Sequence, residues 1–358
     1  METIQTAEAR RSSRDSADAE TPFIHNAWYV IAKGSEVARA PIARTVLGSS
    51  IVLFRTRAGL AVALQNRCCH RSMPLVHGTV EGDTIVCGYH GLRFEPSGRC
   101  VEIPMQETVP KAVRVRAYRT LERGSFVWIW MGAEADADES ALPHQEWMAH
   151  PDWDAQFGYL HVKGSYVHLH ENLLDLSHIS FLHSKTFGSP EYARAPVEVK
   201  IQGGDIQVWR QVECELPAIY AEPLKWVGAR ALRTSGSRYV SPALHVNTGI
   251  FRNLDAPEAS GIAPSVQVAQ LITPETQHST HYWYLLARNF ARGRSDVSEF
   301  MLRQQFDVFS EDAVALERIT EAMALDIGRP VAQISLPTDR AGILMRRHLK
   351  HLSDLERR

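Results

Sequence analysis

Two short segments, each carrying one cysteine and one histidine, constrain this chain more than any other feature of its sequence. Cys68 and His70 form a C-x-H pair, and after sixteen further residues Cys87 and His90 form a C-x-x-H pair. Thiolate and imidazole ligands together suit zinc or an iron–sulfur cluster. The chain has five cysteines, an odd number and too few for a disulfide framework. The clustered Cys and His therefore indicate a metal site rather than a disulfide.

The order of the four residues separates the two kinds of metal site. Zinc fingers place two cysteines in one knuckle and two histidines on a helix, whereas here each segment holds one of each. In a Rieske [2Fe–2S] centre one iron takes both cysteines and the other takes both histidines. The order predicts a Rieske cluster held by Cys68, His70, Cys87 and His90, with a zinc knuckle as the alternative. Cys69 could compete with Cys68, but Cys68 preserves the C-x-H spacing.

The residues around these segments alternate in the manner of short strands, and the second half of the chain mixes strands with long helices. Residues 28–130 predict a small all-β domain with many turns. Further strand patterns cover residues 159–170, 197–209, 238–251, 265–273 and 278–288, and helical patterns cover residues 172–183, 298–326 and 340–352. Strands followed by a long helix predict an α+β second domain.

An acidic stretch at residues 133–140 predicts a linker between the two halves. We expect a disordered tail over residues 1–22, a cluster domain over 23–140 and a second domain over 141–358.

Of the 358 residues 44% are hydrophobic, which excludes a chain disordered throughout. A net charge of −2 gives no argument for binding nucleic acid or a membrane surface. With no apolar stretch typical of a signal peptide, we expect a cytoplasmic protein.

A second group of candidate ligands lies in the helical pattern at residues 172–183. Asp175 and His178 are three residues apart and share a helix face. His178 and His183 are five apart, which places them about 140° apart around a regular helix. If both bind one metal, the helix must bulge, loosen or end between them. Because a Rieske cluster needs an electron acceptor, we interpret the pair as part of a 2-His-1-carboxylate iron site.

The third ligand of that site must be a carboxylate, and spacing does not choose it. The late helical pattern offers four acidic residues: Asp307, Glu311, Asp312 and Glu317. Asp312 interrupts an apolar neighbourhood. Asp307 and Glu311 lie four apart, on what could be a solvated face.

With both groups in place, the chain resembles the oxygenase components of Rieske non-haem iron ring-hydroxylating oxygenases. Within them it is similar to the group of vanillate O-demethylase, toluenesulfonate methyl-monooxygenase and dicamba O-demethylase. The segments that carry the resemblance span nearly the whole chain after the tail: 26–30, 67–75, 87–94, 127–132, 172–178, 282–289 and 309–312. The last of these, Phe309-Ser-Glu-Asp312, resembles the segment with the third ligand, so the resemblance selects Asp312.

The resemblance also implies an architecture. It implies a Rieske β-domain followed by a helix-grip (Bet v 1-like) catalytic domain, in which a curved sheet and a long helix enclose the substrate. Such proteins form head-to-tail homotrimers, in which the electron crosses between subunits. By analogy, Asp175 would join His90 of one subunit to His178 of the next, and Asn172 would lie near the iron.

The function implied is that of a terminal monooxygenase component. It would use O2 to O-demethylate, or to hydroxylate the methyl group of, a small aromatic acid, with one [2Fe–2S] cluster and one mononuclear Fe(II) per subunit. Electrons would come from NADH through a separate reductase, since the sequence has no dinucleotide-binding G-x-G-x-x-G after a strand. Two alternatives stay open: a dioxygenase making cis-diols, and an electron carrier without the mononuclear iron. A structural zinc protein is a more remote one.

The substrate pocket is where the sequence says least. His245, Asn247, His281 and Trp283 lie on predicted strands that could line a cavity. Four basic residues could hold a carboxylate or sulfonate, since the Arg fork matches such anions: Lys225, Arg230, Arg233 and Arg288.

Overall fold

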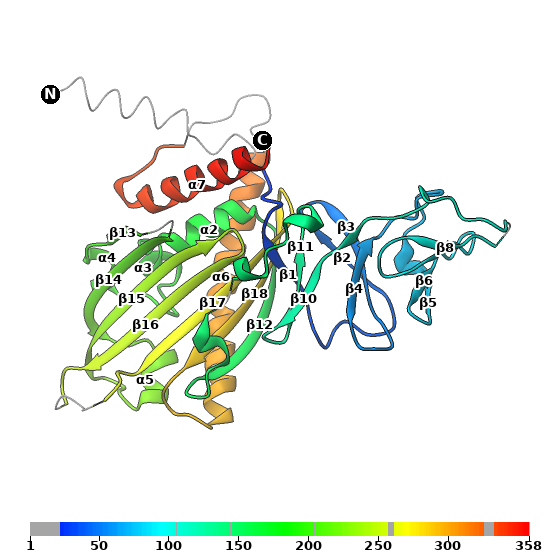
Figure 1. Ribbon diagram of the computed structural model, residues 1–358. Helices are drawn as coiled ribbons and strands as arrows, with labels where there is room; N and C mark the ends of the chain where they lie inside the picture. The colour runs from blue at the N-terminus through cyan, green and yellow to red at the C-terminus, as the bar shows by residue number, and fades with distance from the viewer. Residues whose placement is uncertain are drawn as a thin grey trace, which may run out of the picture. The chain divides into compact units, whose positions relative to one another are not determined.

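The computed structural model describes residues 22–104, 106–143, 145–202, 205–256, 261–325 and 333–357 (Figure 1). Almost all of the tail predicted over residues 1–22, and residues 203–204 within the strand pattern predicted over residues 197–209, lie outside these ranges. The chain divides into two compact units. One comprises His25–Leu142 with Thr273–Thr276, and the other comprises Pro143–Ile272 and Gln277–Arg358 together with the residues up to Ile24.

The first unit is built from short strands in three sheets. A three-stranded sheet has the order β1 (Trp28–Lys33), β11 (Phe126–Trp130), β10 (Thr120–Arg123). A four-stranded sheet has the order β2 (Ile42–Val46), β3 (Ser49–Arg55), β4 (Ala61–Gln65), β9 (Ala117–Tyr118). The last sheet has the order β5 (Thr79–Glu81), β6 (Thr84–Val86), β7 (Arg93–Phe94), β8 (Cys100–Glu102). The all-β prediction for this half is therefore confirmed.

Two tight hairpins show how the sequence produces this unit. Leu47 and Gly48 join β2 to β3, and both have positive φ, at 49° and 73°. Gly124 and Ser125 join β10 to β11 in the same way, at 62° and 68°. Two consecutive residues of positive φ form the turn that matches the twist of paired strands. Each hairpin uses a glycine for one of these positions because glycine adopts it without steric cost.

The second unit contains a seven-stranded sheet. Its order is β12 (Asp154–Val162), β18 (Ser279–Arg288), β17 (Ser265–Thr276), β16 (Leu244–Asn253), β15 (Arg230–Ser241), β14 (Asp205–Glu215), β13 (Glu198–Gln202). Strands β13 to β17 follow one another as an antiparallel meander, and β12 pairs antiparallel with β18. The first and last strands of the unit thus meet at one edge of the sheet.

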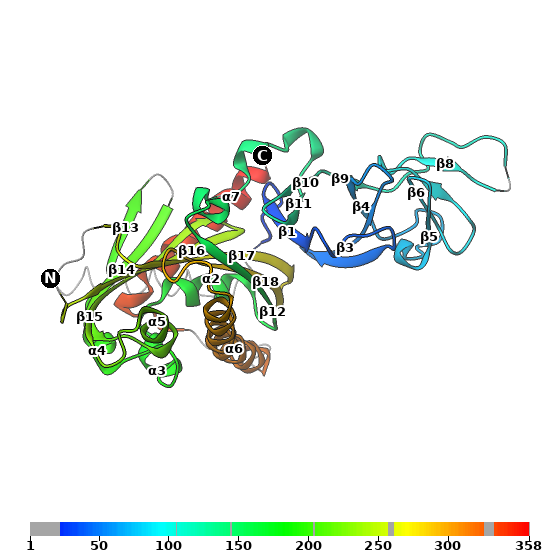
Figure 2. The same cartoon turned by 90° about the horizontal axis from the view of Figure 1, so that it is seen from below.

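Helices pack against this sheet. They are α2 (Tyr166–Leu174), α3 (Ile179–Leu182), α4 (Pro190–Arg194), α5 (Ala218–Leu224), α6 (Ser295–Leu325) and α7 (Arg340–Glu356). Figure 2 shows α3, α4, α5 and α6 on the same side of the curved sheet. Helix α6 buries a stripe at helical spacing: Met301, Gln305, Val308, Phe309, Asp312 and Leu316. A curved sheet against a long helix confirms the α+β prediction. None of the described helices is long and apolar enough to cross a membrane.

Three sequence predictions in this unit differ from the structure. The strand predicted over residues 159–170 ends at Val162, because Ser165 caps a helix by accepting a hydrogen bond from the Val167 amide. The strand predicted over residues 238–251 is two strands, with a turn at residues 242–243. The helix predicted over residues 172–183 is two helices, α2 and α3. Alternation and helical spacing locate such segments but give their ends poorly.

Candidate functional site

The two Cys-His segments form loops with the same backbone hydrogen bonds. The amide of Cys68 donates to the carbonyl of Met73, and the amide of Cys87 donates to that of Leu92, five residues on in both loops. Ser72 and Gly91 are the fourth residues after these cysteines. The amide of each donates a hydrogen bond back to the carbonyl of its cysteine. Those two residues have positive φ, at 60° and 72°. Both loops therefore turn tightly around a cysteine whose side chain faces inward.

The side chains of the two loops separate into two pairs. Cys68 and Cys87 are both 2% exposed and belong to the same buried cluster. Burial, partly offset by an amide hydrogen bond and reinforced by Cys87, raises the pKa of the Cys68 thiol to about 11. The rings of His70 and His90 lie outside this core, 4.6 Å apart between centroids. A buried cysteine pair beside an exposed histidine pair matches the two irons of a Rieske cluster.

A single zinc ion would need all four side chains to reach one point. Among the described residues, the group whose ligand atoms converge to single-ion distances is a different one, made of His178, His183 and Asp312. The loops therefore fit a two-iron cluster better than a zinc knuckle.

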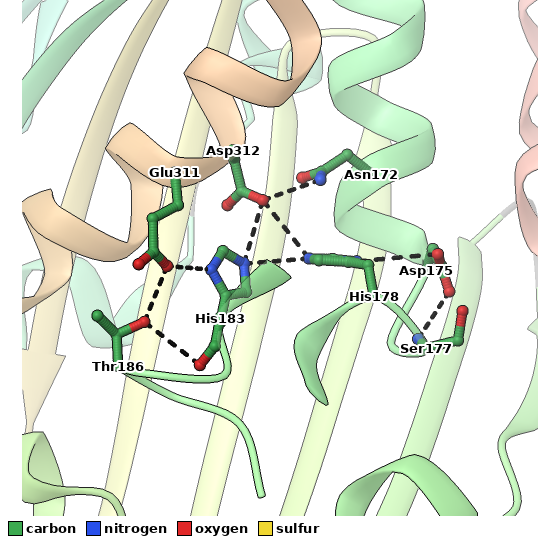
Figure 3. A network of polar contacts seen from close by, with 8 residues as sticks. All are labelled: Asn172, Asp175, Ser177, His178, His183, Thr186, Glu311 and Asp312. Carbon is green, nitrogen blue, oxygen red and sulfur yellow. Dashed lines mark hydrogen bonds and ion pairs between the residues drawn. The ribbon is translucent and has the colours of Figure 1, made fainter. Parts of the chain in front are cut away.

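His178, His183 and Asp312 meet in the second unit (Figure 3). The Nε2 atoms of the two histidines lie 3.2 Å apart, and the Asp312 Oδ1 lies 3.5 Å from the first and 3.1 Å from the second. Such separations suit three ligands on one face of a single ion. His183 and Asp312 are buried, and His178 is partly exposed. This is the geometry of a 2-His-1-carboxylate iron site, whose remaining positions are open.

The two histidines lie at the two ends of the short helix α3, which follows a break after α2. Helix α2 ends at Leu174, and the Asp175 Oδ1 accepts a hydrogen bond from the Ser177 amide, 2.7 Å away, which turns the chain. Helix α3 then begins at Ile179 with His178 as its N-cap. Helix α3 ends at Leu182, and its C-cap His183 has φ −99° and ψ 27°. The helix thus ends before it reaches the second histidine, which is one of the three outcomes (a bulge, a loosening or an end) expected if both histidines bind one metal.

Polar side chains surround the three ligands. The Nδ2 of Asn172 donates to the Asp312 Oδ1 at 2.9 Å, and the Nδ1 of His183 lies 2.6 Å from the Glu311 Oε2. The hydroxyl of Thr186 donates to the same Glu311 oxygen. A carboxylate on Nδ1 fixes the histidine tautomer with Nε2 free to bind metal. From the sequence, Glu311 was a possible third ligand or a residue on a solvated face. Two signals in the sequence could have identified its role: its position next to Asp312, and the rule that a metal-binding histidine donates its other ring N–H to a carboxylate.

The charges of the site stabilise one another. Burial lowers the pKa of His178, but the carboxylates of Asp175 and Asp312 outweigh it and raise that pKa to about 9. Burial raises the pKa of Asp312, and the hydrogen bonds and charges of the two histidines reverse this and lower it to about 2. The Asp175 Oδ2 lies 3.8 Å from the His178 Nδ1, too far for a hydrogen bond. The carboxylates of Asp175 and Asp312 favour a proton on His178, and a metal ion bound at the site would replace that proton.

The three ligands border a cavity between the sheet, α6 and the segment around α3. It contains about 680 Å³ of space free of protein atoms, counting its open mouth. Most of its lining is apolar, with a few polar groups: Leu173, Leu176, Ile179, Phe187, Tyr192, Tyr220, Arg233, Ser235, Gly236, Asn247, Thr248, Gly249, Val266, Val268, Gln305, Val308 and Phe309, besides Asn172, Asp175 and the ligands. Apolar walls with a few polar groups are typical of a small-molecule site.

Of the four predicted substrate residues, the structure places Asn247 on this cavity. His245 is on the same face of β16 but is enclosed by His170 and Tyr239, with ring centroids 4.7 and 5.4 Å away. His281 and Trp283 belong to the other face of β18. Their rings pack with Tyr159, whereas the alternate residues Tyr282 and Tyr284 pack on Phe309 of α6. His245, His281 and Trp283 therefore do not line the cavity.

Comparisons with known proteins agree with a chain made of two domains. Residues 27–117 match the Rieske [2Fe-2S] domain, and residues 162–355 match the vanillate O-demethylase oxygenase C-terminal domain. The toluene-4-sulfonate monooxygenase system iron-sulfur subunit of Comamonas testosteroni is 35% identical over 87% of this chain and 92% of that protein. The dicamba O-demethylase oxygenase component of Stenotrophomonas maltophilia is 29% identical over 93% of this chain and 99% of that protein.

Solved structures extend this likeness to the fold. A crystal structure of dicamba monooxygenase bound to 3,6-dichlorosalicylic acid superposes with a TM-score of 0.87, at 28% identity over 94% of this chain and 99% of that one. A further crystal structure of that enzyme, with a TM-score of 0.79 and 28% identity over 94% of this chain and 99% of that one, contains non-haem iron and dicamba. With a Rieske domain, a converging His-His-Asp group and relatives that match nearly end to end, this chain belongs to the oxygenase components of Rieske non-haem iron monooxygenases, which carry a [2Fe–2S] cluster and a mononuclear iron.

Proposed function

We propose that this protein is the terminal oxygenase component that inserts one oxygen atom from O2 into the methyl or O-methyl group of a small aromatic acid. The observation that carries the proposal is the position of His178, His183 and Asp312 at the wall of a largely apolar cavity. The relatives include enzymes named for a sulfonated toluene, dicamba and vanillate, and one named as a chloroacetanilide N-alkylformylase. All of these names describe aromatic compounds.

The ligand assignments form part of the proposal. Cys68 and Cys87 would bind one iron of the cluster, and His70 and His90 the other. We also propose that the two domains span residues 23–140 and 141–358. When bound, the cluster supplies single electrons and the mononuclear iron supplies the reductive activation of O2.

The protein's own residues orient these groups. Glu311 holds the Nδ1 proton of His183, so that Nε2 faces the metal. Asn172 occupies one lone pair of the Asp312 Oδ1 and so limits how the carboxylate can rotate. The apolar walls exclude water from the substrate, which protects the reduced site from unproductive chemistry. An electron carrier without a mononuclear iron would need none of these features.

A separate reductase supplies the electrons, as it does for oxygenase components. We propose that the oxygenase is a homotrimer in which His90 of one copy faces Asp175 of the next. Asp175 suits this role because its Oδ1 is engaged by Ser177 while its side chain stays partly accessible beside His178. A closed, head-to-tail ring provides such a contact for every subunit. The cytoplasmic location stays a prediction, which cell fractionation would test.

The decisive experiment combines product analysis with one variant. With a surrogate reductase and NADH, a methoxybenzoate should yield a phenol and formaldehyde, and a methylbenzoate should yield the hydroxymethyl acid. His178→Ala should abolish both products and lower the iron content from about three to about two per chain, while the visible spectrum of the cluster stays intact. A cis-diol product would instead identify a dioxygenase. Loss of the cluster spectrum in His178→Ala would contradict two separate metal sites.

A further inference from the structure

One buried cation on the cavity wall has no role in metal binding. Arg233 lies on β15, is 1% exposed and lines the cavity that the three iron ligands border. Its side chain shares a face of the sheet with Ser235, because residues two apart in a strand point the same way. Ser235 lines the same cavity.

The guanidinium group of Arg233 is only partly satisfied by the protein. Its Nη1 donates to the Phe187 carbonyl at 3.0 Å, and its plane lies over the rings of Phe187, Tyr192 and Tyr220, with centroids 4.1, 4.8 and 5.7 Å away. Its Nη2 is buried and has no hydrogen-bond partner. Among the described residues, no carboxylate forms an ion pair with it.

Burying such a cation costs free energy of folding unless other groups pair with its charge and its N–H donors. A buried charge normally needs a counter-ion and its full set of hydrogen bonds. Aromatic faces stabilise the cation but leave its N–H donors unused. Arg210 on the neighbouring strand is also buried and stacks on Tyr192, and its Nε is unpaired as well, but its Nη1 donates to two carbonyls, those of Leu176 and Tyr192. Arg210 does not line the cavity.

We propose that Arg233 is the anion anchor of the substrate cavity, binding the carboxylate or sulfonate of an aromatic acid through its free Nη2. The inference rests on the proposed function and deepens it, because it states which group of the substrate this protein recognises and where. An arginine fork matches a planar carboxylate or a sulfonate, and such a charge-assisted hydrogen bond is strong in a water-poor site.

The same residue would also orient the substrate toward the iron ligands. The amide of Phe187 donates to the carbonyl of His183, so the residue that accepts from Arg233 belongs to the loop that follows an iron ligand. An acid held by Arg233 is thereby fixed relative to His183, and its aromatic ring lies among the apolar walls. The methyl group at the far end of the ring is then directed along the cavity to the metal.

The test compares acids with neutral amides of nearly the same shape. The pairs are 4-methylbenzoate with 4-methylbenzamide, 4-toluenesulfonate with 4-toluenesulfonamide, and 3-methoxybenzoate with 3-methoxybenzamide. Binding is measured by titration calorimetry on the oxidised holoprotein without reductase, so no turnover is required. Wild-type protein should bind at least one acid about 10- to 100-fold more tightly than its amide, the range expected for a hydrogen bond to a charged group.

Two variants and a matched control separate recognition from folding. Arg233→Gln should lose this preference for acids while its affinity for the amides changes little, and Arg233→Lys should retain part of it. Arg210→Gln removes a buried arginine that faces the same aromatic ring, and it should leave the ratio of acid to amide affinity unchanged. If Arg233→Gln does not fold, Arg233→Lys and the wild-type ratios decide the question.

Equal binding of acids and amides by the wild type, or binding of neither, would overturn the anchor. So would an acid preference that survives in Arg233→Gln. The proposed function fails separately: if the acids bind through Arg233 but no oxygenated product appears with reductase and NADH, the anchor stands and the proposed reaction does not. If the amides are oxygenated as efficiently as the acids, the reaction stands and the anchor does not.

Discussion

The two histidines proposed as iron ligands, His178 and His183, differ in what holds the ring nitrogen that faces away from the metal site. The Nδ1 of His183 has a close carboxylate partner in Glu311, whereas the Nδ1 of His178 lies 3.8 Å from Asp175 and makes no hydrogen bond. A fixed tautomer costs no reorganisation when the metal binds. The His183 side of the site is therefore the preorganised one, and the His178 side is free to respond to Asp175.

This difference gives a prediction for Glu311. Glu311→Ala should weaken Fe(II) binding about 10- to 100-fold, the usual cost of losing such a partner, because the His183 ring is no longer held. Competition with a chromophoric chelator measures the affinity. Glu311→Gln, whose amide oxygen can still accept the Nδ1 proton, should recover part of the loss. The cluster spectrum should be unchanged in both variants, and an iron affinity equal to wild type in Glu311→Ala would show that Glu311 does not orient His183.

At the scale of elements, the short segment from α2 to α4 shapes the iron site. After His183 the chain turns back on itself, and the amides of Thr186, Phe187 and Gly188 all donate to the His183 carbonyl. Gly188 comes so close to α3 that a Cβ atom there would lie 2.3 Å from the Ile179 carbonyl oxygen and 2.9 Å from the Ser180 Cα. Only glycine allows this approach, since both neighbours are backbone atoms.

Gly188→Ala should therefore push the loop away from α3. We expect a loss of stability of about 1–3 kcal/mol, typical of overpacking, together with weaker Fe(II) retention. Thermal unfolding and iron analysis after dialysis measure the two effects. Gly34→Ala is a suitable control, because its Cβ would meet nothing closer than the Glu122 Oε2 at 3.4 Å, an ordinary contact. If the two variants behaved alike, the close approach at Gly188 would not control the site.

At the scale of the whole molecule, the stability of the second unit depends on uncharged histidines in its core. His170 of α2 is completely buried, and its Nε2 lies 3.0 Å from the Pro242 carbonyl oxygen. Burial lowers the pKa of His170 from 6.5 to about 4, against a smaller raising effect of that hydrogen bond. Burial and the neighbouring His170 also lower the pKa of His245. Both groups favour the folded state only while they are neutral.

The sign of the pH dependence follows from these shifts. Between pH 6.5 and 4 the unfolded chain binds a proton at residue 170 that the folded chain does not, so the free energy of unfolding falls as the pH falls. For His170 alone the loss between pH 7 and pH 5 is about 2 kcal/mol. Urea unfolding at both pH values should show a smaller loss in His170→Gln than in wild type. The same substitution at exposed His150 serves as the control, and equal losses in all three proteins would contradict the assignment.

The proposed trimer makes a prediction about mixed assemblies. A variant without the cluster, Cys68→Ser, and one without the iron, His178→Ala, should each be inactive. If electrons cross between neighbouring copies, trimers that contain both variants should recover about a third of wild-type activity, since one of the three interfaces in each mixed ring then joins an intact cluster to an intact iron site. Co-expression with two affinity tags isolates the mixed trimers, and the absence of any recovery would contradict transfer between subunits.

The sequence by itself determined the kind of chemistry and most of the elements. The mixed Cys-His order of the first site, the strand alternation of the cluster domain and the helical stripe of α6 are all local patterns, in which the residues that matter are close along the chain. Such patterns can be recognised without knowledge of the fold. The expectation that a regular helix cannot continue from His178 to His183 was also local, because it follows from helical geometry alone.

Tertiary structure decided what local patterns do not encode. Asp312 and Glu311 meet His183 across more than a hundred residues, so spacing alone could not choose between their roles. On β18, residues 281 to 284 are all buried, so alternation did not reveal which pair faces α6; the packing of Tyr282 and Tyr284 on Phe309 did. Arg233 was one of several basic candidates until the fold buried it without a counter-ion. Which charges remain unpaired is a property of the packed molecule, because each pairing depends on elements that only folding brings together.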